Sequence, residues 1–533
     1  MKNILFLITS IIFGITTTCF SQNNNKNLDL IDVQNYNLSI EVNDTTNSIE
    51  ATMEVQLKFK KNTTKFSFDF VEKDTITGKG MVISELLQNK EKINFKHLNN
   101  ELIIYPDTVY ADSIFKYTIK YSGIPKDGLI ISSNLYGDRT FFGDNWPNRA
   151  QNWFPCVDHP SDKATIEYTI KAPNYYQVIA NGLEVEETNL TNNLKLYKYK
   201  SYVPLPTKVM VIGIAKFAVQ NIGETHNIPV STWVYPQTKN EGFYDFSTAK
   251  EILNFFIENV GEYPFEKLAN VQSKTRFGGM ENAGNIFYFE KSVTGKREHE
   301  DLIAHEIAHQ WFGNSATEAN WPHIWLSEGF ATYFTNLYIQ KAKGEAAFQQ
   351  RLSNEKEKVI AFSKEQQIPI IDYVSTNLMS LLNPNSYQKG SWFLRMLHLK
   401  LGNEKFWKGI QLYYNTYKFK NATTDDFRNC MEKVSNRNLE DFFHEWLGQA
   451  GHPILKTSWI YHQKKVRLII EQSQEHNFKF PLDIQLIYKD GTSEIKTIQV
   501  TNKFAPHGIP TKGEVINVKL DPNNHLLFEQ IVD

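Results

Sequence analysis

The spacing of apolar residues changes twice along this chain, and that change constrains its fold more than any other feature. From about residue 33 to 235, apolar and polar residues alternate, for example at Met53, Val55 and Leu57. Strict alternation puts every second side chain on one face, as in antiparallel strands with one buried face. We therefore expect a large antiparallel β domain in this part of the chain.

Helical spacing replaces the alternation near residue 247. Apolar residues recur every four positions at Ile252, Phe256 and Val260, and similar patterns continue to about Leu447. Residues three or four apart share one face of a helix, so a mainly helical domain is predicted. Alternation returns after a glycine- and proline-containing segment at 448–453. There the pair Asp490-Gly491 between apolar runs predicts a hairpin within a small β-sandwich.

Length and composition fit this reading. At about 150 residues per domain, 533 residues predict roughly three domains. We expect a multidomain α+β protein with a β domain at 22–235, a helical domain at 236–450 and a β-sandwich at 451–533. A hydrophobic fraction of 41% and a charged fraction of 22% exclude wholesale disorder. A net charge of -2 argues against a nucleic-acid partner.

Residues 1–21 have the layout of a secretory signal peptide. Lys2 gives a positive start, residues 4–15 are apolar, and small polar residues lead to a cleavage site after Ser21. No later stretch reaches about 18 apolar residues, so we expect an exported protein, periplasmic or extracellular, without a transmembrane segment. A lipid anchor at Cys19 is the less favoured alternative, because no apolar residue stands three positions before it. Cys156 and Cys430 are expected to be buried free thiols.

The segment from His305 to His309, with the sequence His-Glu-Ile-Ala-His, carries the strongest chemical signal. On a helix, positions i and i+4 lie one turn apart, so both imidazoles can bind one metal ion. Glu306 stands beside them, placed to accept a proton from a water on that ion. Catalytic zinc takes a third protein ligand and keeps one open position. Glu328, eighteen residues beyond His309 in an apolar helix-like stretch, is the candidate.

Chance does not account for this pattern. The first element is expected about 0.04 times in a random chain of this composition, and about 0.004 times with the second acid. The plain alternative is a surface helix with two solvated histidines. Ile303, Ala304 and Ile307 argue against it because they predict a buried helix, in which His and Glu need partners. One zinc ion per chain would supply them.

Two further segments are weak signals alone, but their order relative to the metal motif makes them informative. Residues 278–282 read Gly-Gly-Met-Glu-Asn, and Tyr387 precedes an apolar helical run. Together with the metal motif, and with residues 153–160, they resemble the aminopeptidase N family of zinc metallopeptidases, whose catalytic domain is thermolysin-like. The resemblance covers most of the chain beyond the signal peptide, including the order of the three domains.

The resemblance implies specific roles. Glu281 would bind the α-ammonium of a peptide substrate with a free N-terminus, and Gly278 and Gly279 would let the peptide approach as an edge strand. Met280 and Asn282 belong to the same substrate-binding segment. The phenol of Tyr387 would donate to the oxyanion, while Lys389 beside it is expected to be a solvated surface lysine.

One part of the family pattern is missing. Most members carry a second acid or amide before the Phe-Pro-Cys segment, and lining up Pro155 and Cys156 places Trp146 or Asn145 there, not an acid. Asp144 and Gln151 are weak substitutes, so the second amine anchor stays open. Core packing is the favoured role of Trp146, and likewise of Trp153 and Phe154.

The sequence therefore predicts a zinc-dependent aminopeptidase. Three alternatives remain at this point. The same zinc triad could serve a metalloendopeptidase, a non-catalytic peptide-binding protein could have kept the fold, or the site could hydrolyse a lipid epoxide. Glu281 favours the aminopeptidase because an endopeptidase does not need an amine anchor, and the presence of Glu306 and Tyr387 argues against a silent protein.

Overall fold

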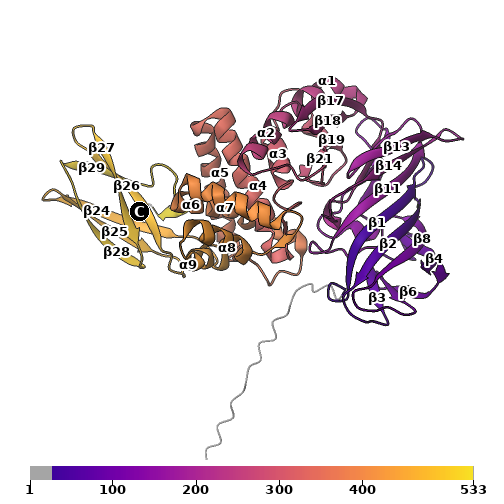
Figure 1. The fold of residues 1–533 in the computed structure, drawn as a ribbon. Coiled ribbons are helices and arrows are strands. Elements are labelled where there is room, and N and C mark those ends of the chain that lie inside the picture. The colour runs from indigo at the N-terminus through magenta and orange to yellow at the C-terminus, as the bar shows by residue number, and fades with distance from the viewer. Residues whose placement is uncertain (1–26, 532–533) are drawn as a thin grey trace, which may run out of the picture.

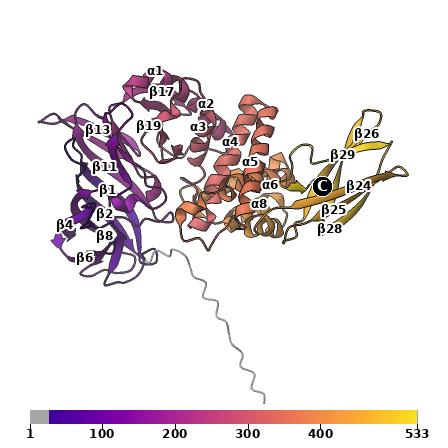
Figure 2. The ribbon, with the colours of Figure 1, turned by 180° about the vertical axis from the view of Figure 1, so that it is seen from behind.

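The computed structural model describes residues 27–531, so the predicted signal peptide and Cys19 lie outside the described residues. Three regions follow one another in a row (Figure 1): β-sheets at one end, helices in the middle and a smaller pair of sheets at the other end. Figure 2 shows the same row from behind. The predicted multidomain α+β architecture is confirmed.

The N-terminal region is built on a large sheet. Its strands, in order across the sheet, are β13 (Leu183–Asn189), β14 (Leu194–Lys200), β11 (Lys163–Pro173), β1 (Ile31–Glu41), β2 (Ile49–Phe59), β8 (Ile114–Ile124), β4 (Gly80–Gln88) and β5 (Glu91–Lys92), with β15 (Leu205–Pro206) beside β11. β1 and β11 run parallel, whereas the other neighbours run antiparallel. In β2, Met53, Val55 and Leu57 are buried and the residues between them are not, as the alternation predicts.

Two smaller sheets complete this region. One contains β12 (Gln177–Ala180), β16 (Ile212–Ala215), β10 (Arg139–Gly143) and β9 (Leu129–Ser133), and the other contains β3 (Phe66–Asp69), β7 (Glu101–Tyr105) and β6 (Asn94–Leu98). Phe66, Phe68 and Phe70 are all buried, as their spacing predicts, although β3 ends at Asp69.

A mixed sheet follows next and carries one wall of the functional site. Its strands, in order, are β17 (Ala218–Thr225), β18 (Ile228–Val234), β19 (Leu268–Ser273), β21 (Asn285–Phe289) and β20 (Gly279–Met280). The sheet crosses the domain boundary expected at residue 235, because β18 pairs with β19. β20 is an edge strand, bonded to β21 on one side.

The middle region is mainly helical. Its helices are α1 (Lys239–Phe246), α2 (Ala249–Asn259), α3 (Glu300–His309), α4 (Trp325–Lys343), α5 (Glu345–Glu365), α6 (Gly390–Leu401), α7 (Asn403–Tyr417), α8 (Thr424–Ser435) and α9 (Glu440–Phe443), and a short parallel pair joins β22 (Thr317–Glu318) to β23 (Asn421–Ala422). The predicted helical spacing is confirmed in α2, which buries Ile252 and Phe256 and ends just before Val260.

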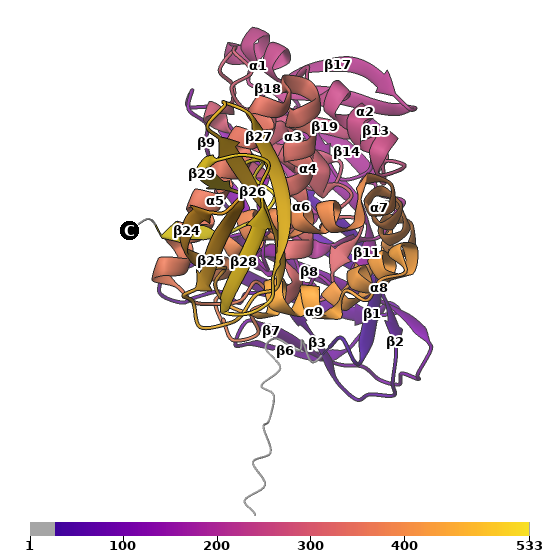
Figure 3. The same ribbon diagram turned by 90° about the vertical axis from the view of Figure 1, so that its left-hand side faces the viewer.

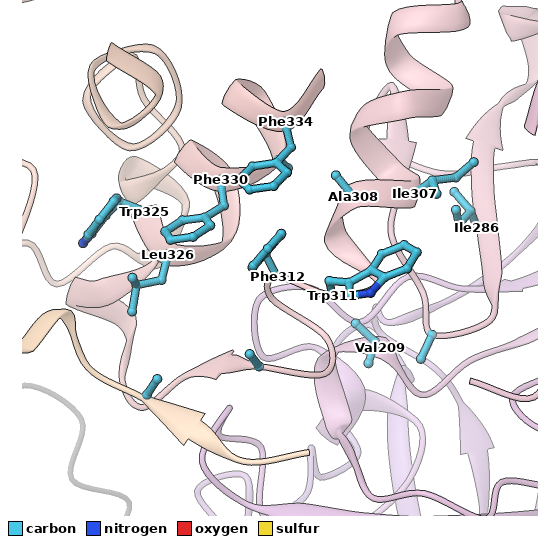
Figure 4. Close-up of a cluster of buried hydrophobic side chains, with 14 of the residues drawn as sticks. Val209, Ile286, Ile307, Ala308, Trp311, Phe312, Trp325, Leu326, Phe330 and Phe334 are labelled. Carbon is cyan, nitrogen blue, oxygen red and sulfur yellow. The ribbon is translucent and has the colours of Figure 1, made fainter. Parts of the chain in front are cut away.

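An aromatic core fixes α3 against α4 (Figure 4). The ring of Phe312, just after α3, lies 4.8 Å from both Phe330 and Phe334 on α4. Trp311 packs on the other side against Phe256, with 5.7 Å between the ring centroids. Because these large rings are buried, the two helices cannot shift independently without opening cavities in a close-packed core.

The C-terminal region has two facing sheets, nearest the viewer in Figure 3. One contains β28 (Phe504–Pro510), β25 (Lys465–Gln472), β24 (Ile454–His462) and β30 (Glu529–Ile531), and the other contains β27 (Ser493–Val500), β26 (Phe480–Tyr488) and β29 (Val515–Leu520). The turn between β26 and β27 contains Asp490 and Gly491, so the predicted hairpin is confirmed. Cys156 and Cys430 are buried free thiols, as expected. Among residues 27–531, no helix is long and apolar enough to cross a bilayer.

Candidate active site

Helix α3 presents His305, Glu306 and His309. The helix buries Ile303, and Ile307 one turn later, which turns the two histidines toward the first turn of α4. His305 Nε2 and His309 Nε2 lie 3.1 Å apart, as expected for residues at positions i and i+4 whose rings point at one place.

Helix α4 supplies the third group. Glu328 lies in its first turn, and its Oε2 is 3.5 Å from His305 Nε2 and 3.3 Å from His309 Nε2. A tetrahedral zinc ion, with bonds of about 2.0–2.1 Å to nitrogen and oxygen, holds ligand atoms about 3.3–3.4 Å apart. The three donors therefore fit one zinc ion, and the sequence prediction that they converge is confirmed.

The charge of the surroundings also calls for a cation. Carboxylate oxygens of Glu281 and Glu306 lie within 4.8 Å of each other and of a ring nitrogen of His309. Burial raises the pKa of Glu306, and the neighbouring carboxylates Glu281 and Glu328 raise it further. Burial alone would lower the pKa of His309, but the three carboxylates raise it to about 10. The site is strongly negative, which favours a divalent cation.

The second ring nitrogen of His309 is held by residues that sequence reasoning did not name. Nδ1 of His309 lies 3.1 Å from the carbonyl oxygen of Phe312 and 3.0 Å from the hydroxyl of Ser327. Donation from Nδ1–H to the carbonyl leaves the lone pair on Nε2, the atom that faces Glu328. Ser327 directly precedes Glu328, so one position of α4 orients His309 and the next supplies the third ligand.

These groups line a cleft of about 230 Å³. The lining residues are Trp146, Phe277, Gly278, Gly279, Met280, Glu281, Leu302, His305, Glu306, His309, Glu328, Leu382 and Tyr387. The structure thus gathers the predicted metal ligands, Glu306, Tyr387 and the segment from Gly278 to Glu281 in one cavity. Asn282 is fully buried and is not part of the lining.

Glu281 presents an unpartnered carboxylate to the cleft. The residue is 5% exposed, and its Oε1 has no hydrogen-bond partner among the described residues. Its main chain is fixed, because the side-chain amides of Gln310 and Asn314 both donate to the Glu281 carbonyl. Sequence reasoning did not identify this pair of amides, which lie within five residues of the end of α3.

Tyr387 faces the metal ligands from the opposite wall. It lies in a π-helical turn, Asn385–Lys389, and its ring stacks on that of His305 with 6.0 Å between centroids. Burial raises the pKa of Tyr387, so the phenol keeps its proton.

The expectation of a solvated Lys389 is wrong. The turn directs Lys389 inward, where it is 1% exposed, donates to the Gln449 carbonyl at 3.3 Å and has its pKa lowered by burial to about 7.

The residues considered as a second amine anchor have other roles. Asp144 is bound by Arg149 at 2.6 Å, and Asn145 donates to the carbonyl of Thr207 at 3.0 Å. Gln151 donates to the main chain at Asn148, and like Asp144 and Asn145 it is absent from the cleft lining.

Trp146 has the expected core role and also lines the cleft. Trp153 and Phe154 are completely buried in the hydrophobic core, as predicted. Trp146 is also buried, against Phe277 and Trp321, but one side of it lines the cleft. The indole of Trp146 therefore gives the cleft an apolar wall.

Comparisons with known proteins agree with this site. A model of the peptidase M1 N-terminal domain matches residues 33–209, and a model of the peptidase family M1 domain matches residues 244–446. Similar curated proteins include glutamyl aminopeptidase of Rattus norvegicus (28% identical, covering 68% of this chain and 40% of the relative). Glutamyl aminopeptidase of Homo sapiens is 30% identical (68% and 40%), and probable aminopeptidase 2 of Sulfurisphaera tokodaii is 32% identical (58% and 41%).

This chain spans about 40% of the length of those relatives. The two matched segments contain every proposed metal ligand and both walls of the cleft. With a zinc triad at His305, His309 and Glu328, the chain belongs to the peptidase M1 family of zinc metallopeptidases.

Proposed function

We propose that this chain is an exported zinc-dependent aminopeptidase that removes N-terminal residues from peptides. The observation that carries the proposal is the unpartnered carboxylate of Glu281 in the same cleft as the zinc triad. A buried carboxylate needs a cation, and the α-ammonium of a peptide is one. The names of the curated relatives, which are aminopeptidases, support the same class of reaction.

The formal charges of the site balance in such a complex. Glu281, Glu306 and Glu328 carry three negative charges when ionised, while His305 and His309 are neutral as ligands. One divalent ion and one ammonium carry three positive charges together. Substrate and metal would thus neutralise a buried cluster of acids, which relieves the repulsion that raises the pKa of Glu306.

The chain's own residues can carry the proton transfers. When bound, zinc supplies Lewis acidity and lowers the pKa of a water toward about 7. Glu306 would accept the proton from the attacking water and deliver it to the leaving amine. Tyr387, held opposite His305, would donate its phenolic proton in a hydrogen bond to the developing oxyanion.

The backbone of β20 would position the peptide. β20 is bonded to β21 on one edge, and Gly278 and Gly279 line the cleft at the other side. An extended peptide can add to such an edge, with its main chain bonded to the strand. Its ammonium would then lie at Glu281, and its first carbonyl near the zinc ligands.

The residues of the cleft wall favour peptide substrates with an apolar N-terminal side chain. Trp146, Phe277, Met280 and Leu382 form this wall, and among the residues that line the cleft there is no lysine or arginine. An acidic side chain would meet the carboxylates of the site without a compensating cation, which costs binding energy. Export is supported by the signal-like composition of residues 1–21, with Lys2 ahead of an apolar run.

A panel of aminoacyl amide reporters tests the proposal, with and without a zinc chelator. We expect hydrolysis of leucine and phenylalanine amides, its loss on chelation and its return with zinc. Glu281→Ala should raise KM for free-amine substrates far more than it changes the cleavage of N-acetylated peptides. Efficient cleavage of N-acetylated peptides, with amide reporters left intact, would show a metalloendopeptidase instead.

A further inference from the structure

A second cavity adjoins the first cleft at the metal ligand His305. It has a volume of about 360 Å³ and shares Leu302, His305 and Tyr387 with the first cleft. Its other lining residues are Asp301, Thr332, Arg351, Asn354, Glu355, Lys358 and Gln388. No residue of the segment 278–281 lines this cavity, so it lies away from the amine anchor.

One face of α5 gives this cavity its charge. Arg351, Glu355 and Lys358 stand at positions i, i+4 and i+7, and therefore point to the same side of the helix. The guanidinium of Arg351 is oriented by two neighbours: Nε donates to Asn336 Oδ1 at 2.6 Å and Nη1 to Asp301 Oδ2 at 2.9 Å. Its charge is fixed in place and matched by Asp301.

The remaining two charges of this face differ in their partners. Glu355 is buried and accepts hydrogen bonds from Asn336 and Ser391, both at 2.8 Å, and burial raises its pKa to about 7. Lys358 is exposed, and among residues 27–531 no carboxylate lies within 4.0 Å of its ammonium, although its charge acts on the carboxyl of Glu355. An unpaired ammonium thus faces the cavity beside a preoriented guanidinium.

The two cavities therefore have opposite character. The first holds three carboxylates and neither lysine nor arginine among its lining residues. The second holds both basic residues, Arg351 paired with Asp301 and Lys358 on the same helical face as the buried Glu355. A short peptide with both termini free has the complementary polarity, with an ammonium at one end and a carboxylate at the other. The zinc ligand His305 and Tyr387, which lie between the cavities, would face the bond that joins the two halves of such a substrate.

Resting on the aminopeptidase function proposed above, we propose that the second cavity binds the leaving-group end of short peptides through a carboxylate. Lys358 receives the C-terminal carboxylate, and Arg351, whose charge is matched by Asp301, adds oriented N–H donors. The preferred substrate class is then di- and tripeptides with a free C-terminus, and less so long chains or C-terminal amides.

The test compares Leu-Ala-Ala with its C-terminal amide, and uses leucine p-nitroanilide as a reporter without a peptide leaving group. We expect kcat/KM to be about fivefold higher for the free carboxylate, a ratio in the range of one exposed ion pair. Raising the salt concentration should reduce this ratio, because exposed charges are screened. Leu-Ala-Ala-Glu-amide shows whether an acidic side chain can replace the terminus.

Substitutions of Lys358 test whether this residue binds the C-terminal carboxylate. Lys358→Ala should remove the preference and Lys358→Glu should reverse it, while hydrolysis of leucine p-nitroanilide stays the same. The matched control is Lys364→Ala, which removes an exposed lysine of the same helix that pairs with Glu529 outside the cavity. An unchanged carboxylate preference in both Lys358 variants, or no preference in the unmodified chain, overturns the inference. If the unmodified chain does not hydrolyse leucine p-nitroanilide, the proposed aminopeptidase function is refuted instead.

Discussion

The carboxylate of Glu306 rests against the main chain of Gly279. A Cβ atom added to Gly279 would stand 2.5 Å from Cδ of Glu306, which is closer than nonbonded carbon atoms approach. The adjacent Gly278 has room, since a Cβ there would have Leu302 Cδ1 as its nearest neighbour at 3.8 Å. The edge strand and the proposed proton acceptor therefore lie against each other, and a side chain can be added at Gly278 but not at Gly279 without moving Glu306.

Gly279→Ala should displace Glu306 and lower kcat, whereas Gly278→Ala should retain most of kcat. Because the clash falls on a carboxylate at the end of a side chain, the fold should survive and the metal ligands should stay in place. We expect a loss of at least about tenfold in kcat for a misplaced general base. Zinc content and kcat are measured for both variants. Equal kcat values in the two variants would contradict the contact.

Glu306→Gln should retain zinc and lose turnover. Glutamine has a similar shape but cannot accept and release a proton, so a loss of about 10²–10⁴ in kcat is expected. Metal analysis together with steady-state kinetics checks this. A variant that keeps a tenth of the activity would rule out Glu306 as the base.

Tyr387→Phe should lower kcat by about 10²–10³ with a smaller change in KM, since an oxyanion donor acts mainly in the transition state. The ring can still stack on His305, so the geometry of the site should persist. Kinetics with leucine p-nitroanilide measures both constants. A change confined to KM would show that Tyr387 binds the ground state instead.

Trp146→Ala should change which substrates are preferred. The indole forms part of the cleft wall together with Phe277 and is supported from behind by Trp321. Its removal should reduce kcat/KM for phenylalanine amide about tenfold relative to alanine amide. The ratio of the two substrates is the readout, because it is insensitive to the amount of folded protein. Trp146→Phe should preserve much of the ratio, and an unchanged ratio in Trp146→Ala would remove Trp146 from the pocket.

Asp162→Asn should stabilise the protein more as the pH rises. Burial raises the pKa of Asp162 to about 7, whereas an unfolded aspartate has a pKa near 3.9. Between these values the unfolded chain is ionised and the folded chain is not, so ionisation of the unfolded state progressively lowers the free energy of unfolding. The difference in Tm between variant and parent should therefore grow from pH 5 to pH 7 and then level off. Asp490→Asn is the control, because the pKa of Asp490 is lowered and the residue is exposed. A constant difference for Asp162→Asn would contradict the prediction.

Much of the molecule could be predicted because the relevant signals are local. The convergence of His305 and His309 needs only a helix, and Glu328 adds one more helix packed beside it. The roles of Ser327 and Gln310 depend on how segments far apart in sequence meet, so no local pattern indicates them. The residue type predicts a solvated Lys389, since lysines are usually exposed, but a π-helical turn that the residue types do not reveal sets its direction.

The second cavity was also beyond sequence reasoning. Arg351 and Lys358 share a helical face, which the sequence does show, but the position of α5 beside Tyr387 follows from packing of α4, α5 and α6. The mixed sheet is a similar case. Its strands β17 and β18 precede the predicted boundary at residue 235, and alternation alone does not tell which sheet a strand joins.

The hydrogen bonds from Gln310 and Asn314 to the carbonyl of Glu281 have a consequence for the position at which a peptide substrate would be cut. Gln310 is the first residue after the helix that carries His305 and His309, and Asn314 lies four residues further on. The segment proposed to receive the peptide's N-terminus is therefore tied to the helix proposed to hold the ion. On the proposed function, this connection would hold the site for the substrate's ammonium at a constant distance from the metal ligands. Cleavage would then fall after the first residue, whatever the length of the peptide.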